Sequence, residues 1–460
     1  MPRTVELRAM RPAPAWAAEL VALLGVGGPL IAAQLATIAL TATDVVMLGW
    51  LGPEPLAASA LASAIMHPLL FFGTGVALAS APLIAQALGA RRRRDVRRSL
   101  RQGLWATLAM AAVMIPLLML TGEALRLTGQ SAALAAMAET YVSWAAWHLA
   151  PFMGFVVLRG FIAAHGQTRV VLTVTLAGVA LNMLGNYTLI FGNFGLPRME
   201  LAGAGLSTVL CHAGMFALLA LHVARVAPYR RYAPFARFWR PDWARFRAIF
   251  AMGLPIGLML AAETGLFSGV ALLMGWLGPD ALAAHAIALQ LAAIAFMTPL
   301  GLSQATTARV GLAFGAGEGE AVRRAAWVAM GATLGFMGLT AAVFVAAPRA
   351  LVGLFLDPIG AAGAFGLAVS YLGVAALFQL ADGAQVSAAA ALRGLGDTRA
   401  PMLAAVTGYW LIGLPAAWLL GFPLGLEGLG VWLGIAVGLA AAAAMLIWRL
   451  AALTAPSRLP

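Results

Sequence analysis

Three acidic residues stand in stretches of the sequence that are otherwise almost free of charge. Asp44, Glu263 and Asp382 each lie within a long apolar run, whereas nearly all of the other acids, out of 17 Asp and Glu, flank such runs. An ionised acid at the centre of a bilayer costs at least about 2.5 to 3.5 kcal/mol on insertion scales. Each of the three should therefore face a cavity or a partner, or be protonated. We expect no arginine at comparable depth in any helix, so a structural salt bridge is not the expected explanation.

A carboxyl group inside an apolar membrane span can have only a few functions. A buried carboxyl can exchange a proton, bind Na⁺ or hold a cationic ligand, one at a time. Competition of two cations for the same or coupled carboxylates is the chemical basis of exchange between them. The alternative is a protonated acid that makes one interhelical hydrogen bond and has only a structural role.

Two asparagines are candidates for additional oxygen ligands. Asn182 and Asn186 are four residues apart and therefore project from one face of a helix. The side-chain oxygen of Asn suits a hard cation, so the expected Na⁺ site consists of Glu263, Asp382, Asn182 and Asn186. Hydrogen bonding between helices is the competing explanation for the asparagines.

The apolar runs predict an all-α integral membrane protein. Hydrophobic residues make up 62% of the chain and charged residues 10%, with a mean hydropathy of +0.91, which no soluble core explains. Nine charge-free intervals exceed the ~20 residues that a helix needs to cross a bilayer, and three more do so with one acid each: 127–158, 248–279 and 358–392. The sequence therefore predicts twelve transmembrane helices, and their length and composition argue against a transmembrane barrel.

The sequence also repeats itself. The stretch MLGWLGPEPLAASALA (47–62) matches LMGWLGPDALAAHAIA (273–288) at ten of sixteen positions, at an offset of 226 residues. Six helices per half is an even number, so both halves enter the membrane from the same side. We expect two pseudo-symmetric lobes, 1–226 and 248–460, joined by a cytoplasmic linker at 227–247. Two such bundles around a central cleft are typical of proteins that open alternately to either side, and this favours transport.

The basic residues are all arginines, 29 of them, and they are unevenly placed. The absence of lysine excludes a Walker lysine and a Schiff-base lysine, so ATP-driven pumping by this chain alone is not expected. With a cytoplasmic amino terminus, 26 arginines fall on the cytoplasmic side and three, Arg126, Arg198 and Arg349, on the other. This positive-inside pattern predicts cytoplasmic N- and C-termini. It also favours contact with anionic membrane lipids over nucleic acid.

Other patterns yield no catalytic residues. Gly394-Leu395-Gly396-Asp397 matches the GxGD pattern of intramembrane aspartyl proteases, but it lies at a helix end and is better explained as a turn. That chemistry needs two facing aspartates, and Asp382 is about four turns away. The lone cysteine, Cys211, excludes an intramolecular disulfide. His67, His285 and Gln290 are given no role.

Several stretches together resemble the multidrug and toxic compound extrusion (MATE) transporters, in particular their NorM-like bacterial branch. The similar stretches cover essentially the whole chain: TDVVMLGWLG, LNMLGNYTLIFGNFGLP, LPIGLMLAAETGLF, AAHAIALQLAAIAFMTPLGLSQATTARVG and ADGAQVSAAAALRGLGDTRAP. The resemblance implies a MATE/MOP-type fold of two six-helix lobes in the bacterial inner membrane.

The resemblance also implies a function. It implies export of cationic or zwitterionic drugs and dyes by a monomer, driven by Na⁺ and/or H⁺, with no cofactor and no enzymatic activity. Asp44 corresponds to the acid of the amino-terminal lobe, Glu263 and Asp382 to cation-coupling acids of the carboxy-terminal lobe, and Asn182 and Asn186 to asparagines of the fifth helix.

One departure and three alternatives remain. Phe378 stands where NorM-like relatives often carry a tyrosine, which removes an oxygen ligand and leaves protons, Na⁺ or both as coupling ions. A lipid-linked oligosaccharide flippase of the same superfamily should gather basic residues in its cleft, and the intramembrane charges here are acidic. A membrane-embedded enzyme lacks a credible catalytic pair, and an ion channel suits a two-lobed repeat less well.

Overall fold

The computed structural model describes residues 15–455, and these fold into long helices. The predicted cytoplasmic location of the chain ends concerns residues 1–14 and 456–460, which lie outside the described part. Twelve helical stretches of that part are long and apolar enough to cross a membrane, which confirms the number predicted.

The helices of the two halves follow one another in the same order. In the first half they are α1 (Ala15–Leu51), α2 (Pro53–Leu78), α3 (Ser80–Gly89), α4 (Arg93–Leu118), α5 (Thr121–Leu127), α6 (Ala132–Ala145), η1 (Ala146–His148), α7 (Leu149–Ala164), α8 (Arg169–Leu189), η2 (Asn193–Gly195) and α9 (Glu200–Arg225). After η3 (Tyr229–Tyr232), in the connection, the second half has α10 (Trp243–Leu277), α11 (Pro279–Ala316), α12 (Gly319–Ala346), α13 (Pro348–Val352), α14 (Ala362–Leu395), α15 (Arg399–Val406), η4 (Thr407–Gly413), α16 (Leu414–Gly421) and α17 (Glu427–Leu453).

The repeated WLGP motif makes the same turn in both halves. Gly52 separates α1 from α2 at a φ of 131°, and Gly278 separates α10 from α11 at a φ of 112°. Only glycine adopts such angles without strain. Proline follows each glycine at the first helical position, where its missing N–H costs no hydrogen bond. The repeated sequence therefore folds into the same local structure in both halves of the chain.

Each half has its own apolar core. One cluster of buried side chains is built almost wholly from the first half, and a second, centred on residues such as Tyr371, Tyr409 and Trp432, lies in the second half. A few residues of the second half, among them Ile256 and Leu302, join the first cluster. Because the buried side chains divide into two clusters, the chain forms two lobes, and only a few residues connect their cores.

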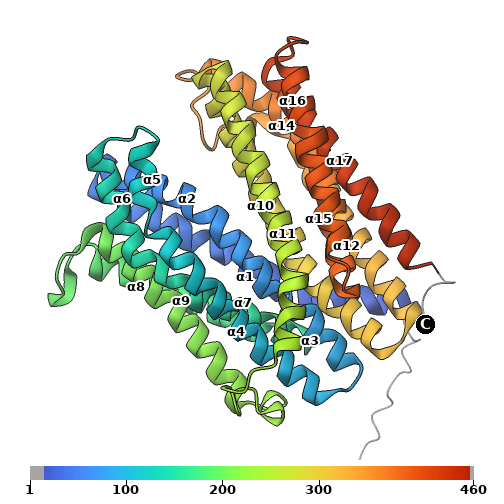
Figure 1. The fold of residues 1–460 in the computed structure, drawn as a ribbon. Coiled ribbons are helices and arrows are strands. Elements are labelled where there is room, and N and C mark those ends of the chain that lie inside the picture. The colour runs from blue at the N-terminus through green and yellow to red at the C-terminus, as the bar shows by residue number, and fades with distance from the viewer. Residues whose placement is uncertain (1–14, 456–460) are drawn as a thin grey trace, which may run out of the picture.

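Contacts between the lobes gather at one end of the helices, the arginine-rich end, where the connections at 90–92, 226–242 and 396–398 lie. There α2 crosses α10 backbone to backbone, because a Cβ on Gly75 would overlap the main chain of Gly257. Glu19 of α1 and Arg309 of α11 form an ion pair across the lobes. Figure 1 shows the same arrangement, with α2 and α10 close together toward the bottom and diverging toward the top.

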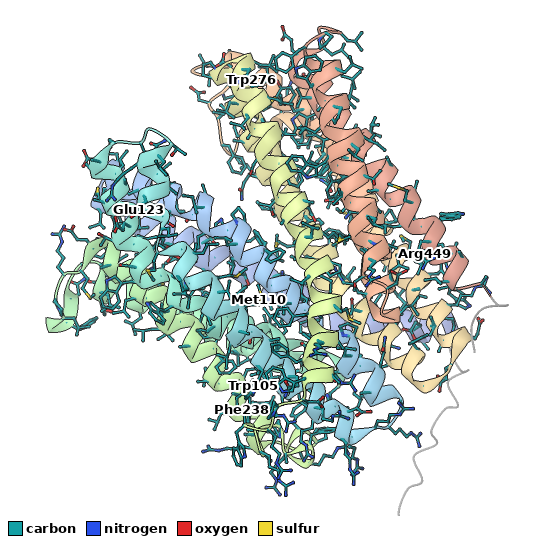
Figure 2. The ribbon with its side chains drawn as sticks, viewed as in Figure 1. Trp105, Met110, Glu123, Phe238, Trp276 and Arg449 are labelled. Carbon is teal, nitrogen blue, oxygen red and sulfur yellow. The ribbon has the colours of Figure 1, made fainter. Side chains whose placement is uncertain are left out.

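The connection between the lobes is held against α4. Trp105 donates its indole N–H to the carbonyl oxygen of Phe238 (3.0 Å), and Arg101 donates to that of Arg237 (3.1 Å). Figure 2 shows Trp105 and Phe238 next to each other at the lower end, opposite Trp276. The connection is thus a fixed structural element of the arginine-rich end.

Candidate functional site

Asp44 of α1 is bound by both predicted asparagines. The side-chain amides of Asn182 and Asn186, on α8, donate to the Oδ1 atom of Asp44 at 3.1 and 2.6 Å. The spacing of four residues places both amides on one face of α8, and α8 packs against α1. The sequence thereby positions two donors on a single carboxylate oxygen.

The second oxygen of Asp44 carries no hydrogen bond within the described residues, and it is not among their fully enclosed unpaired atoms. It therefore retains access for a proton or a cation. The asparagines are almost fully buried, and the Oδ1 atom of Asn186 is enclosed without a partner. Tyr141 and Cys211 lie near enough for the Asp44 charge to act on them. These groups form the first acid centre.

This pairing changes the ligand set expected from the sequence. The four-residue site of Glu263, Asp382, Asn182 and Asn186 is not assembled, since the asparagines bond to Asp44 and no hydrogen bond within residues 15–455 joins them to the other acids. The reason is the chain path, because α8 packs on α1 and α9. Hydrogen bonding between helices, the competing explanation, accounts for the amide contacts.

Glu263 and Asp382 make up a second acid centre, in the second lobe. Their charges act on one another, and neither carboxyl accepts a hydrogen bond from any described residue. Asp382 is 6% exposed, and Glu263 is half-buried. Two neighbouring carboxyls of this kind cannot both be ionised cheaply in a low dielectric unless a cation lies between or beside them. Their arrangement suits binding of one proton or one metal cation.

Tyr409 belongs to this centre, although the sequence analysis overlooked it. Its ring is fully buried, and its hydroxyl lies close to both acids and to the amide of Gln385, without a well-formed hydrogen bond to any described residue. Both amide atoms of Gln385, one helical turn after Asp382, are likewise enclosed and unpaired. Each such group costs roughly 1 to 3 kcal/mol if left unpaired. The second centre therefore gathers polar atoms that are available to a ligand.

The position of Tyr409 depends on a local widening of its helix. Residues Thr407–Gly413 form a π-helical turn, η4, between α15 and α16. π-Bulges of this kind often occur at functional sites. The next residue, Trp410, donates its indole N–H to the carbonyl oxygen of Ala262 at 3.1 Å. This bond fixes η4 against α10 directly beside Glu263.

Arginines do reach into the lobes, contrary to the sequence expectation. Arg393 near the end of α14 is close enough to Glu263 for the two charges to interact, although no ion pair within 4.0 Å forms between them in the described part. Arg159 of α7 donates to Gln34 at 3.1 Å. Long arginine side chains extend several ångströms from the Cα atom, so an arginine near a helix end reaches deeper into the lobe than its position in the sequence indicates.

Other polar residues in or near the spans have structural partners. Glu139, in a predicted span, is exposed and pairs with Arg126 at 2.8 Å. Asp397 of the GxGD stretch accepts from Arg449 (2.9 Å) and from the backbone N–H of Ala400 (3.2 Å). Phe378, which stands where NorM-like relatives often carry a tyrosine, packs against Phe267 and Trp432. Glu139 and Asp397 therefore each have a basic partner in the structure.

Comparison with known proteins identifies the family. The MatE family model matches residues 29–188 and 255–419, one match in each lobe. A probable multidrug resistance protein NorM of Mesorhizobium japonicum is 46% identical over 450 residues, covering 97% of this chain and 96% of the relative. The chain belongs to the MATE family. A NorM relative of Brucella suis is 42% identical over 441 residues, covering 94% of this chain and 93% of the relative.

Solved structures of MATE transporters have the same fold. The eukaryotic MATE transporter AtDTX14 aligns with a TM-score of 0.85 at 22% identity, covering 95% of this chain and 96% of the other. The Vibrio cholerae MATE transporter VcmN, in a mutant form, aligns with a TM-score of 0.87 at 20% identity and coverage of 95% and 98%. At these identities the likeness concerns the fold. Together with the NorM-like relatives it makes this MATE-family chain a multi-pass membrane transporter of the multidrug efflux type, and not an enzyme.

Proposed function

We propose that this MATE-family chain is an antiporter that exports cationic or zwitterionic drugs and dyes in exchange for Na⁺ or H⁺. The supporting observation is the presence of two separate acid centres, one in each lobe. Asp44 has one oxygen held by two amides and the other unbonded. Glu263 and Asp382 have no hydrogen-bond donors at all among described residues. Cargo and driving ion compete for, or are coupled through, these carboxyls.

Each centre has a part in the proposal. At the first, the unbonded oxygen of Asp44 takes a proton or a positively charged cargo, while Asn182 and Asn186 keep the carboxylate oriented. At the second, Glu263 and Asp382 share the coupling cation, with the hydroxyl of Tyr409 and the amide of Gln385 as further oxygen ligands. Oxygen ligands of this type suit Na⁺ as well as a proton. The carboxylate charge that attracts the cation is the common element.

Alternating access completes the proposal. The conformation described has its lobes in contact at the arginine-rich end, and a rocking motion would open that end and close the other. The positive-inside rule places the arginine-rich end in the cytoplasm, and with it both termini. The chain would act as a monomer in the bacterial inner membrane, with its apolar outer surface in contact with lipid.

Transport in proteoliposomes tests the proposal. The full chain would be reconstituted with a fluorescent organic cation inside, and efflux would be followed under an imposed ΔpH or ΔpNa, each applied alone. Coupled efflux under at least one gradient is expected. The variants Asp44→Asn, Glu263→Gln and Asp382→Asn should each abolish it, because the amide keeps the size of the side chain but cannot carry a negative charge.

Glu139→Gln is the matched control, since Glu139 is an exposed acid paired with Arg126, and its efflux should stay at the wild-type rate. Normal coupled efflux in all three acid variants would refute the antiport mechanism. Chemical alteration of the dye during the assay would contradict transport as the activity.

A further inference from the structure

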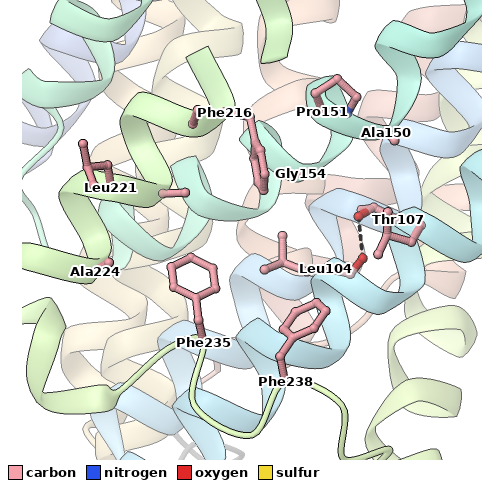
Figure 3. Close-up of a pocket in the computed structure, with 13 residues that line it drawn as sticks. Leu104, Thr107, Ala150, Pro151, Gly154, Phe216, Leu221, Ala224, Phe235 and Phe238 are labelled. Carbon is pink, nitrogen blue, oxygen red and sulfur yellow. Dashed lines mark hydrogen bonds between the residues drawn. The ribbon is translucent and has the colours of Figure 1, made fainter. Parts of the chain in front are cut away.

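An apolar cavity lies in the outer wall of the first lobe, and none of its lining residues belongs to either acid centre. Its volume is about 670 Å³, within the range of about 300 to 1,000 Å³ common for ligand sites. Helices α4, α7 and α9 form its walls, and the connection between the lobes closes its arginine-rich end. Figure 3 shows Phe235 and Phe238 of that connection pointing into the cavity toward Leu104 and Gly154.

The lining of the cavity suits hydrocarbon. Thr107 is the only lining residue with a polar side chain, and its hydroxyl donates to the carbonyl oxygen of Leu104 at 2.8 Å, so no polar group is left for a ligand. Leu108 is 51% exposed and Leu221 is 44% exposed, so the cavity opens on the lipid-facing side of the lobe. Molecules of the bilayer therefore have direct access to it.

A basic pocket of about 510 Å³ lies next along the chain. Ala224 lines the apolar cavity and Arg225 lines the basic pocket, together with Ala227, Pro228, Arg230 and Arg231. None of these three arginines forms an ion pair with an acid in the described part of the chain. Arginine binds phosphate oxygens through paired N–H donors. The pocket is thus complementary to a phosphate group.

The connection that closes the apolar cavity is held rigidly against α4. Gln102 donates to the carbonyl oxygen of Arg240 at 3.4 Å, and Trp105 donates to that of Phe238 at 3.0 Å. Arg98 pairs with Asp242 at the start of α10. A site whose walls are fixed before binding loses little conformational entropy when a ligand enters.

We propose that these two pockets form one binding site for an anionic phospholipid. One acyl chain occupies the apolar cavity, and the phosphate group binds Arg225, Arg230 and Arg231. The amphipathic character of the site decides the ligand class. A soluble phosphate leaves the cavity unfilled, and a zwitterionic lipid, whose phosphate charge is balanced by its own ammonium group, leaves the charge of the three arginines uncompensated. The site touches the connection between the lobes, so a bound lipid would stabilise the position of that connection.

Native mass spectrometry of the full chain in detergent tests the site. The protein would be titrated with phosphatidylglycerol, with phosphatidylethanolamine of the same acyl chains, and with glycerol 3-phosphate. We expect phosphatidylglycerol to bind at least tenfold more tightly than the other two. Equal binding of the two phospholipids, or displacement of phosphatidylglycerol by equimolar glycerol phosphate, would overturn the proposal.

Two variants separate the two halves of the site. Replacing Arg225, Arg230 and Arg231 together by Gln should bring the affinity for phosphatidylglycerol down to that for phosphatidylethanolamine. Ala217→Trp adds bulk at an exposed position of the cavity wall. It should weaken the binding of both phospholipids severalfold without removing any charge. Size-exclusion profiles identical to wild type would establish that both variants are folded.

The controls match each change elsewhere on the molecule. Replacing the exposed Arg92, Arg93 and Arg94 by Gln removes the same charge at the same end, and Ala444→Trp adds the same bulk to an exposed position of α17. Both controls should retain wild-type affinities. If the arginine control reduced phosphatidylglycerol binding as much as the site variant did, the proposed pocket would be refuted in favour of general surface charge.

Discussion

The ion pair between Glu19 and Arg309 offers a direct test of how the lobes are held together. Arg309 donates from Nε and from Nη2 to the two carboxylate oxygens of Glu19, the second at 2.6 Å. The partners lie on α1 and α11, in different lobes. Glu19→Gln removes the charge and keeps the size, so it weakens the contact at the arginine-rich end without creating a cavity.

The magnitude follows from the burial of the pair. The side chains of Glu19 and Arg309 are 13% and 26% exposed. Exposed pairs contribute up to about 1 kcal/mol, whereas removing one partner of a buried pair costs about 3 to 5 kcal/mol. An intermediate cost of roughly 2 kcal/mol is therefore expected, and at about 1.4 kcal/mol per factor of ten it shifts the equilibrium toward opening of this end roughly 30-fold.

Cysteine reactivity measures that shift. Ala305 of α11 is fully buried and faces Gly27 of the other lobe, while the native Cys211 is also fully buried. In an Ala305→Cys background, the rate of reaction with N-ethylmaleimide reports how often the arginine-rich end opens. Glu19→Gln should raise this rate roughly 30-fold.

The controls use charge in two ways. Glu139→Gln breaks an exposed pair within one lobe and should leave the rate unchanged. Exchanging the two charges, with Glu19→Arg and Arg309→Glu together, should restore most of the slow reaction. An unchanged rate in Glu19→Gln, or an equal rise in Glu139→Gln, would refute the assignment of this pair as a contact that holds the lobes together.

Three further predictions concern other contacts. Tyr409→Phe should weaken binding of the coupling cation roughly 10-fold or more, since a hydrogen bond to a charged group is worth about 1.5 to 3 kcal/mol. The cation concentration that gives half-maximal efflux measures this affinity, and an unchanged value would exclude Tyr409 as a ligand. Gly257→Leu should increase maleimide labelling in the Ala305→Cys background, because a side chain there meets the backbone of α2, and slower labelling would contradict the crossing. The hydrogen bond from Arg98 lowers the pKa of Asp242 below its ordinary 3.8, so this pair stabilises the connection fully above pH 3.8 and loses its effect as the pH falls through the lowered value. Amide exchange at residues 233–242, corrected for its intrinsic rate, should rise in that acidic range in the wild type and not in Asp242→Asn.

Helix number and the two-lobed fold could be predicted from the sequence because they depend on local pattern. Runs of apolar residues give the spans, and the Gly-Pro turn after Trp50 and Trp276 recurs at a fixed offset. The hydrogen-bond partner of the two asparagines could not be predicted from local sequence pattern. Spacing places Asn182 and Asn186 on one face of α8, but which helix that face meets depends on packing between distant segments.

Tyr409 was missed for a different reason. Acids, amides and histidines stand out in an apolar span, whereas a tyrosine is common in membrane helices. Its position in the second centre depends on the π-helical turn at Thr407–Gly413. Such a turn changes the direction in which side chains project, compared with an ideal α-helix. A lone tyrosine in an uncharged span, followed by a tryptophan, was the available signal.

The arginines that reach into the lobes also required the structure. Arg159 and Arg393 occupy equivalent positions of the repeat, in the sequences LRGF and LRGL. Arg159 is bonded to Gln34 and lies over the ring of Phe155 at 5.9 Å, whereas Arg393 lies near Glu263. Each arginine thus has its own neighbours in its own lobe. They do not form the joint basic cluster that binding of a lipid pyrophosphate requires.

The duplicated scaffold carries unequal chemistry, and this bears on the mechanism. At the repeat offset of 226 residues, Asp44 corresponds to Val270 and Glu263 to Thr37, so neither acid has an acidic counterpart in the other lobe. A symmetric pair of sites would give two interchangeable binding events. Here one centre offers a single carboxylate held by amides and the other a pair of carboxyls without donors, so their cation affinities must differ. In the proposed antiport cycle, coupling between cargo and ion would then have a fixed direction, because the two lobes could not exchange roles.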